Sequence, residues 1–330
     1  MTTTVARVDS SRIRVSTNEL SMLLAWLAAG GLFLVGSLTI SGFSSLASIK
    51  SLLVLAAILG IAAAGQTLVI VLGGIDLSIA ALMTLTDVML PQLTSHGWNI
   101  ATAIALAVAL CTAIGATNGF VARSLSVHPL LITLGANFIV NGALLAWTGG
   151  APTGSSPSWL TDLVSPARSL GPIPLPPVVA IWAAVAVVML VLANRTTFGR
   201  RVYALGSSPS AAEYALVRPV RTWTIAFAIS GFMAAIAGLM LSGFTGYGDV
   251  NSGDPYLFDT VAAVVIGGTS LLGGRGGYFR TIAGSLALIE IQILLVGYGI
   301  GPNPQQVALG LIIVGLALIY GRDRHIRYRI

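Results

Sequence analysis

The chain has 330 residues, of which 55% are apolar and 8% are charged, and its net charge is +6. A soluble domain carries about a quarter charged residues, so this composition excludes an ordinary soluble enzyme and predicts a polytopic membrane protein. The arginines fall in short loops between apolar runs and form no continuous basic face, so nucleic acid is not expected as a partner. Cys111 is the only cysteine, which excludes an internal disulfide and gives no metal-ligand cluster.

Membrane-length apolar segments follow a polar tail of residues 1–19. A spanning helix needs about 20 residues, and ten segments qualify, near 20–40, 51–72, 76–94, 99–122, 129–148, 177–194, 222–246, 257–272, 281–300 and 304–321. The first exceeds a signal-peptide core, which indicates a retained helix. The eighth is short, which predicts a half-helix or a re-entrant piece. We therefore expect an all-α fold with about ten transmembrane helices, one of them broken or re-entrant, in a single domain over 20–321.

The basic residues in the loops predict the orientation of these helices. With the N-terminus inside, fifteen of the seventeen basic residues face the cytoplasm, and only Lys50 and Arg168 lie outside. Cytoplasmic loops carry an excess of lysine and arginine. Both the N-terminal tail and the C-terminal tail, residues 322–330, are therefore expected in the cytoplasm. Within the outer loop 149–176, the stretch WLTDLV predicts a short interfacial helix.

The stretch VLGGIDLSIA, residues 71–80, places two glycines and an acid between two apolar runs. Gly73 or Gly74 can end one helix in the left-handed conformation, and Asp76 can then cap the next helix. One interpretation is a tight hairpin with Asp76 as an ordinary cap near water. The other is a broken helix, in which the backbone freed at Gly73–Ser78 lines a path through the membrane or transmits movement.

The loop 195–221 is the largest one expected on the cytoplasmic side and the richest in charge. Ser208 or Ser210 can open a short helix, Ser210 and Glu213 have capping-box spacing, and Pro219 stops the helix. The helix is expected to expose Ala212, Tyr214, Ala215 and Val217 between the arginine pairs 200/201 and 218/221. A helix this short needs a partner surface to be stable. The alternative is a solvated loop whose arginines only set the topology.

A third glycine-rich stretch, FDTVAAVVIGGTSLLGGRGG, covers residues 258–277. Asp259 is expected to cap a helix just outside the membrane, and the pairs Gly267-Gly268 and Gly273-Gly274 to break it. The stretch is not an ATP site, because the Walker pattern needs a Gly-Lys-Ser/Thr and the only lysine, Lys50, follows an isoleucine. VIGGTSLL weakly echoes VLGGIDLS, which suggests an internal repeat.

Several polar residues fall inside the apolar runs. Carboxylates at such positions, Asp87 and Glu290, are functional candidates, whereas amides more often form hydrogen bonds between helices. The amides and the hydroxyl in question are Gln66, Thr67, Asn118, Asn137, Asn141 and Gln292. The sequence contains no HExxH or GxSxG pattern, so an intramembrane hydrolase has no support.

Several blocks of sequence together resemble the inner-membrane permeases of ribose-type sugar ABC importers, within the branched-chain amino acid/sugar permease superfamily. These blocks are GGIDLS at 73–78, the residues from Pro129 to Gly135, TFGRRVYALG at 197–206, Asp259 with AAVVIGGTS at 262–270, GGRG at 273–276, and QQV at 305–307. They occur in the family's order and cover roughly residues 45–321. The chain departs from the family at Ser207-Ser208, where Gly-Asn is usual, at 215–217 and at 278–280. These departures bear on which ATPase it fits and on whether it pairs with itself or with a paralogue.

The resemblance implies a subunit of the cytoplasmic (inner) membrane that translocates a small sugar or polyol by ATP-driven alternating access. It implies an ABC ATPase partner that holds the ATP and Mg, an extracytoplasmic sugar-binding protein, and a second permease copy or paralogue. No cofactor and no catalytic residue are expected in this chain. The residues expected to couple to the ATPase are Gly199, Arg200, Ala212, Glu213, Tyr214 and Arg218. The break or gate would comprise Gly73, Gly74, Asp76, Ser78, Gly267 and Gly268, and the substrate path Gln66, Asn137 and Asn141.

Rival interpretations remain open. A related ABC permease for a branched-chain amino acid or a signalling furanose would share the architecture. An ion- or proton-coupled secondary transporter would work without an ATPase and would use Asp87 and Glu290 as its ion sites. A membrane-embedded structural or enzymatic protein is the least favoured, because the sequence lacks a catalytic constellation.

Overall fold

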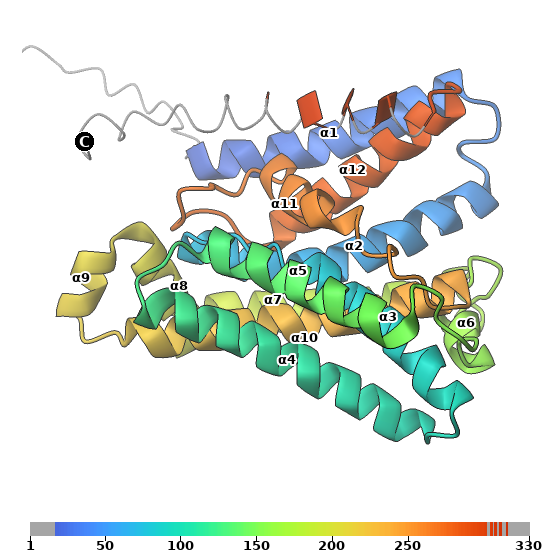
Figure 1. Ribbon diagram of the computed structural model, residues 1–330. Helices are drawn as coiled ribbons and strands as arrows, with labels where there is room; N and C mark the ends of the chain where they lie inside the picture. Colours follow the sequence, from blue (N-terminus) through green and yellow to red (C-terminus); the bar gives the residue numbers. More distant parts are fainter. Residues whose placement is uncertain (1–16, 302–303, 306, 309, 312–314, 316–330) are drawn as a thin grey trace, which may run out of the picture.

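The computed structural model describes residues 17–301 together with 304–305, 307–308, 310–311 and 315, and within these it is all-helical (Figure 1). The long helices are α1 (Thr17–Thr39), α2 (Leu46–Leu72), α3 (Ile79–Ser95), α4 (Ile100–Ser124), α5 (Pro129–Thr148), α7 (Pro177–Arg195), α10 (Pro219–Thr245) and α12 (Tyr278–Gly297). The short helices are α6 (Ser158–Val164), α8 (Thr197–Ser207), α9 (Pro209–Tyr214) and α11 (Tyr256–Ile266).

Seven of these helices are long and apolar enough to cross a membrane, namely α1, α2, α4, α5, α7, α10 and α12. The prediction of a polytopic helical membrane protein is confirmed at this level. The count of ten spans is not, because α3 has 17 residues and α11 has 11, and segment 304–321 lies largely outside the described residues. The polar tails expected at 1–19 and 322–330 also fall almost entirely outside them.

Helices α2 and α3 form the centre of the bundle. Every residue of α2 from Ala56 to Leu72 is buried, and α3 is buried from Ile79 to Gln92. Helices α10, α11, α12 and α7 pack around α2 and bury it. Helices α4 and α10 cross at backbone contact, since a Cβ added to Gly115 would strike the carbonyl of Phe227.

The two ends of the bundle differ, and we name them after the short helices that lie there. Figure 1 shows α8 and α9 at one end and α6 at the opposite end. The short helix predicted at WLTDLV is present as α6, and Trp159 on it is exposed. The segment before α6 is fixed to α10 by Ser156, whose hydroxyl donates to the carbonyl of Ser242 at 2.7 Å.

The connection from α10 to α11 folds back into the bundle along α3. Gly248 lies against Val88, and Gly253 lies against Ala80, two turns nearer the α9 end. Eight helical residues correspond to about 12 Å of axis. Helix α11 therefore begins part-way along the bundle, as expected of a half-helix.

Candidate functional site

The chain breaks between α2 and α3 at the glycine pair, as the sequence predicted. Gly73 adopts φ +94°, in the left-handed region that glycine occupies at little cost, and its amide bonds the carbonyl of Ile70. The amide of Gly74 bonds the carbonyl of Val69 at 2.9 Å. The carbonyls of Val69 and Ile70 in the last turn of α2 are thus satisfied by the chain's own amides.

Asp76 lies entirely inside the protein, with no exposed surface. Its Oδ1 accepts from the amide of Ser78 at 3.0 Å and from the Ser78 hydroxyl at 2.6 Å, and its Oδ2 accepts from the hydroxyl of Ser230 in α10 at 2.7 Å. The interpretation of Asp76 as a cap near water is therefore wrong. The N-cap of α3 is Ser78, and Asp76 instead ties the break to α10.

The break is also held by α4 and α5. Asn118 of α4 donates to the Ser78 hydroxyl at 3.0 Å. On α5, the hydroxyl of Thr133 accepts from the amide of Leu77, and Asn137 donates to the carbonyl of Leu77, each at 3.0 Å. Six side chains, Asp76, Ser78, Asn118, Thr133, Asn137 and Ser230, thus form what we call the break network.

Sequence reasoning missed two of the six. Thr133 and Ser230 carry no local signal beyond a hydroxyl in an apolar run, and only the packing of α5 and α10 brings them to the break. Asn137 was expected on the substrate path. Its amide is committed to the backbone of Leu77, and Asn141 donates in turn to Asn137 at 3.2 Å. Asn137 thus binds the break directly, and Asn141 is linked to the break through Asn137.

Gln66, the other residue expected on the path, lies in α2 and is fully buried. Neither its Nε2 nor its Oε1 has a hydrogen-bond partner among the described residues. Unpaired buried amides are rare and cost free energy, because the lost hydration is not replaced. Gln66 therefore remains a path candidate with both polar atoms uncommitted, whereas in Asn141 only Oδ1 lacks a partner among the described residues.

The intramembrane carboxylates have separate surroundings. Asp87 accepts from the amide of Asp249 through Oδ2 at 3.0 Å, and Thr84, one turn earlier, accepts from the amide of Gly253 at 3.1 Å. These two side chains of α3 hold the returning connection from α10. Glu290 lies on α12, and its Oε2 has no partner among the described residues.

The loop 195–221 folds into α8 and α9. Thr196 caps α8, and Ser208 caps α9 by accepting from the amide of Ala211, so Ser208 rather than Ser210 opens the helix. Pro209 occupies the first turn. A capping box with Glu213 does not form, because the Glu213 carboxylate faces another element. Tyr214 and Leu216, at the end of α9, are 91% and 89% exposed.

Two residues expected on the docking surface point inward instead. Ala212 is 3% exposed and packs with Val71, Leu72 and Val202. Gly199 is buried where α8 turns off α7, and a Cβ there would strike the carbonyl of Ala193. The periodicity of a six-residue helix is too short to say which face meets the bundle, so only the tertiary structure decides it.

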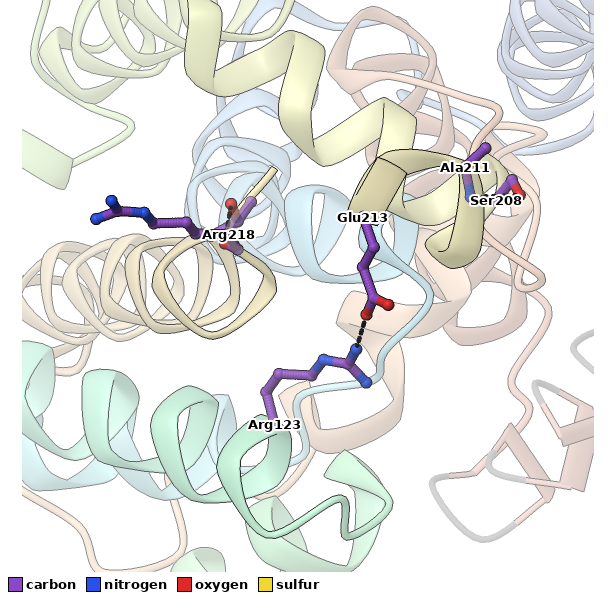
Figure 2. A network of polar contacts seen from close by, with 6 residues as sticks. Arg123, Ser208, Ala211, Glu213 and Arg218 are labelled. Carbon is purple, nitrogen blue, oxygen red and sulfur yellow. Dashed lines mark hydrogen bonds and ion pairs between the residues drawn. The ribbon is translucent and has the colours of Figure 1, made fainter. Parts of the chain in front are cut away.

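Glu213 forms an ion pair with Arg123 at the end of α4, with 2.9 Å between Oε1 and Nη2 (Figure 2). Arg218 points away from this pair in the same view. Arg200 is exposed on α8. Beside α9 lies a cavity of about 510 Å³, lined by Glu213, Leu216 and the residues from Val217 to Val220. The end of α9 thus offers two apolar side chains, a hollow and basic groups.

The Arg123–Glu213 pair gives a test of how firmly α9 is placed. Arg123→Glu should displace α9 and lower solute uptake severalfold at most. A partly exposed ion pair contributes only about 0–1 kcal/mol to stability. Arg123→Glu combined with Glu213→Arg should restore activity. A charge-swapped double variant no better than the single variant would contradict this role for the pair. Solute uptake in vesicles at low and high salt is the measurement.

The glycine stretch after α11 also breaks where expected. Helix α11 ends at Ile266, and Gly268 adopts φ +81°. The expectation that Asp259 caps this helix is wrong. Asp259 lies in the first turn of α11, and its Oδ2 accepts from Gln292 of α12 at 2.9 Å.

The chain was compared with known proteins. Residues 48–320 match the family described as branched-chain amino acid transport system / permease component. The ribose import permease protein RbsC of Bacillus subtilis (strain 168) is 31% identical, over 84% of this chain and 85% of that protein. The autoinducer 2 import system permease protein LsrC of Enterobacter sp. (strain 638) is 31% identical, over 94% and 88%. The probable ABC transporter permease protein YphD of Escherichia coli (strain K12) is 33% identical, over 90% and 87%. No solved structure matches the chain.

The family match covers most of the chain, and the seven apolar helices agree with it. The protein is a multi-pass membrane permease. It belongs to the branched-chain amino acid transport system permease component family.

Proposed function

We propose that this chain is the transmembrane subunit of a binding-protein-dependent ABC importer for a small sugar or polyol in the cytoplasmic membrane. The relatives named for ribose and autoinducer 2 import support a small polyhydroxylated solute. ATP and Mg would be held by a partner ATPase. The fold would pair with a second copy or a paralogue and would receive solute from an extracytoplasmic binding protein.

The observation that carries the proposal is the exposure of apolar side chains at the end of α9. Leu216 has φ +57°, an uncommon conformation for a bulky residue, and yet its side chain is almost fully exposed. Exposed apolar groups in a strained turn are a cost to the isolated subunit. An ATPase surface that buries Tyr214 and Leu216 would offset that cost, with α9 docked as a helix in a groove.

The orientation follows from the loop charges. With both termini in the cytoplasm, the arginines of 195–221 and the α9 end lie on the side where ATP is hydrolysed. The break network would then lie towards the cytoplasmic side of the path. Switching the bundle from 1:99 to 99:1 needs about 5.5 kcal/mol of differential binding, which closure of the ATPase would supply.

A purification tests the proposal directly. The chain is expressed with the products of neighbouring genes, solubilised mildly, and purified through a tag on this chain. We expect an ABC ATPase to be recovered in stoichiometric amount. A preparation without ATPase that still transports in liposomes under an ion gradient would overturn the proposal in favour of a secondary transporter.

Substitution of Asp87 distinguishes an ABC importer from a secondary transporter. The Oδ2 of Asp87 accepts a hydrogen bond from the backbone amide of Asp249, which an amide oxygen can accept equally well. If Asp87 only anchors the connection, Asp87→Asn should keep uptake within about twofold, and Asp87→Ala should lower it by the 5- to 10-fold that one lost hydrogen bond implies. A secondary transporter that binds its ion at Asp87 would instead lose uptake in both variants.

A further inference from the structure

Three glycine-bearing segments, far apart in sequence, meet at the α9 end. They are the last turn of α2 with Gly73, the end of α8 with Gly206, and the loop after α11 with Gly273 and Gly274. The carbonyl of Val71 accepts from the amide of Gly274 at 2.8 Å. We call this meeting point the glycine junction.

Gly206 is the residue of the glycine junction that lies in the loop 195–221. A Cβ at this position would strike the carbonyl of Val71 and would lie 2.7 Å from the amide of Gly274. Both neighbours are backbone, so no side chain can rotate to make room. Glycine is therefore required here by close approach.

Gly273 brings the loop after α11 onto the break itself. It adopts φ +83°, and a Cβ on it would lie 3.1 Å from the backbone nitrogen of Gly73 and 3.0 Å from the carbonyl of Gly206. Gly273 directly follows the stretch VIGGTSLL, so the end of that stretch is brought next to Gly73 of VLGGIDLS.

Tyr203, one turn before Gly206, adds a directional bond. Its hydroxyl donates to the carbonyl of Gly276 at 2.9 Å. Burial raises the pKa of the Tyr203 hydroxyl above its ordinary value, so the hydroxyl stays protonated and remains a donor. The hydroxyl of Ser207 donates more weakly to the carbonyl of Gly274, at 3.5 Å. Helix α8 is thus held to the glycine loop by two side-chain bonds and to α2 by backbone contact.

We propose that Gly206 and Tyr203 are positioning residues that transmit movement of α9 to the break network through the glycine junction. The inference rests on the proposed docking of an ATPase on α9. Helix α9 follows α8 directly, since Ser208 closes one helix and caps the next, and Ala212 of α9 packs on Val71 and Leu72. From Val71 the path reaches Gly73 within two residues and Asp76 within five.

The physical reason is that close contacts between backbones cannot absorb a small displacement. A joint made of long side chains absorbs a small displacement by rotamer changes, whereas a close-packed backbone joint passes it on. Coupling of this kind requires an element with two arrangements that both sites bias. In this inference that element is the break between α2 and α3, which the break network ties to α4, α5 and α10.

The test measures the accessibility of the break itself, so no solute is needed. Ile75, in the break, is replaced by cysteine, and its labelling by a maleimide is followed in the complex with the ATPase, before and after trapping with ATP and orthovanadate. Cys111 is buried, and the chain without the Ile75 replacement measures its background. In the otherwise unchanged complex we expect trapping to alter the labelling rate about fivefold or more, the lower end of ordinary allosteric coupling.

Gly206→Ala should leave the ATPase bound, because Tyr214 and Leu216 are untouched, and should reduce the effect of trapping to less than about twofold. Tyr203→Phe loses one hydrogen bond without a change in packing and should give a partial loss. Gly142→Ala on α5, where an added Cβ meets nothing within 4 Å, is the matched control and should keep the full effect.

The outcomes separate this inference from the proposed function. Absence of ATPase from the unmutated preparation contradicts the proposed function. With ATPase bound, an unaltered labelling rate on trapping, or a full effect in Gly206→Ala, overturns the junction as the link. If Gly206→Ala does not assemble, Tyr203→Phe decides alone, since a full effect there contradicts the inference and a reduced one supports it.

Discussion

Replacing both Tyr214 and Leu216 by alanine should lower the recovery of the partner ATPase by at least about tenfold while the permease stays folded. Both side chains are almost fully exposed, so their loss removes nothing from the core of the subunit. Burying a large apolar side chain in an interface contributes about 1.5–3 kcal/mol, and each 1.4 kcal/mol is a factor of ten in affinity. Quantitative co-purification, with uptake as a second readout, is the measurement.

Leu125→Ala is the control for this experiment. Leu125 is also an exposed leucine at the α9 end, but it caps α4 and lies outside α9. Its replacement should leave ATPase recovery unchanged. Equal losses in the control and in the double variant would mean that the apolar end of α9 is not the docking surface.

Replacing Asp76 by alanine should strongly destabilise the permease itself. The carboxylate accepts three hydrogen bonds inside the protein, from the Ser78 amide, the Ser78 hydroxyl and the Ser230 hydroxyl. A buried donor left without its acceptor costs about 1–3 kcal/mol, which is large against the 5–15 kcal/mol or so that stabilises a folded protein. We expect a lower thermal midpoint in detergent and little protein in the membrane.

A further variant, Asp76→Asn, tests whether the charge or the hydrogen bonds of Asp76 matter. Asp76→Asn keeps one acceptor and can donate to a serine hydroxyl, so it should fall between the native chain and Asp76→Ala. Asp162→Ala is the matched control, because Asp162 is exposed and its pair with Arg168 is exposed as well, so stability should hardly change. An unchanged midpoint in Asp76→Ala would show that the break does not depend on this carboxylate.

Much of the fold follows from the order of residues along the chain. Apolar runs of membrane length, interrupted by glycine, proline and polar loops, predict where helices lie because a lipid-exposed backbone must satisfy its own hydrogen bonds. The left-handed glycine at the end of α2, the break after Ile266 and the short helices α6 and α9 were predicted for local reasons of this kind. A short-range conformational preference needs no knowledge of distant neighbours.

The faces of the helices and the partners of the polar groups were decided only by the tertiary structure. Helix α9 has only six residues, so its periodicity did not show that Ala212 turns inward. In an apolar helix such as α5 almost every face looks alike, so the sequence did not show that Asn137 binds the backbone of Leu77. Nor does anything near Ser230 or Thr133 in the sequence indicate the break that they hold. The meeting of Gly73, Gly206 and Gly273 depends on three segments approaching at backbone distance, and such an approach is a property of packing, which links residues some two hundred positions apart.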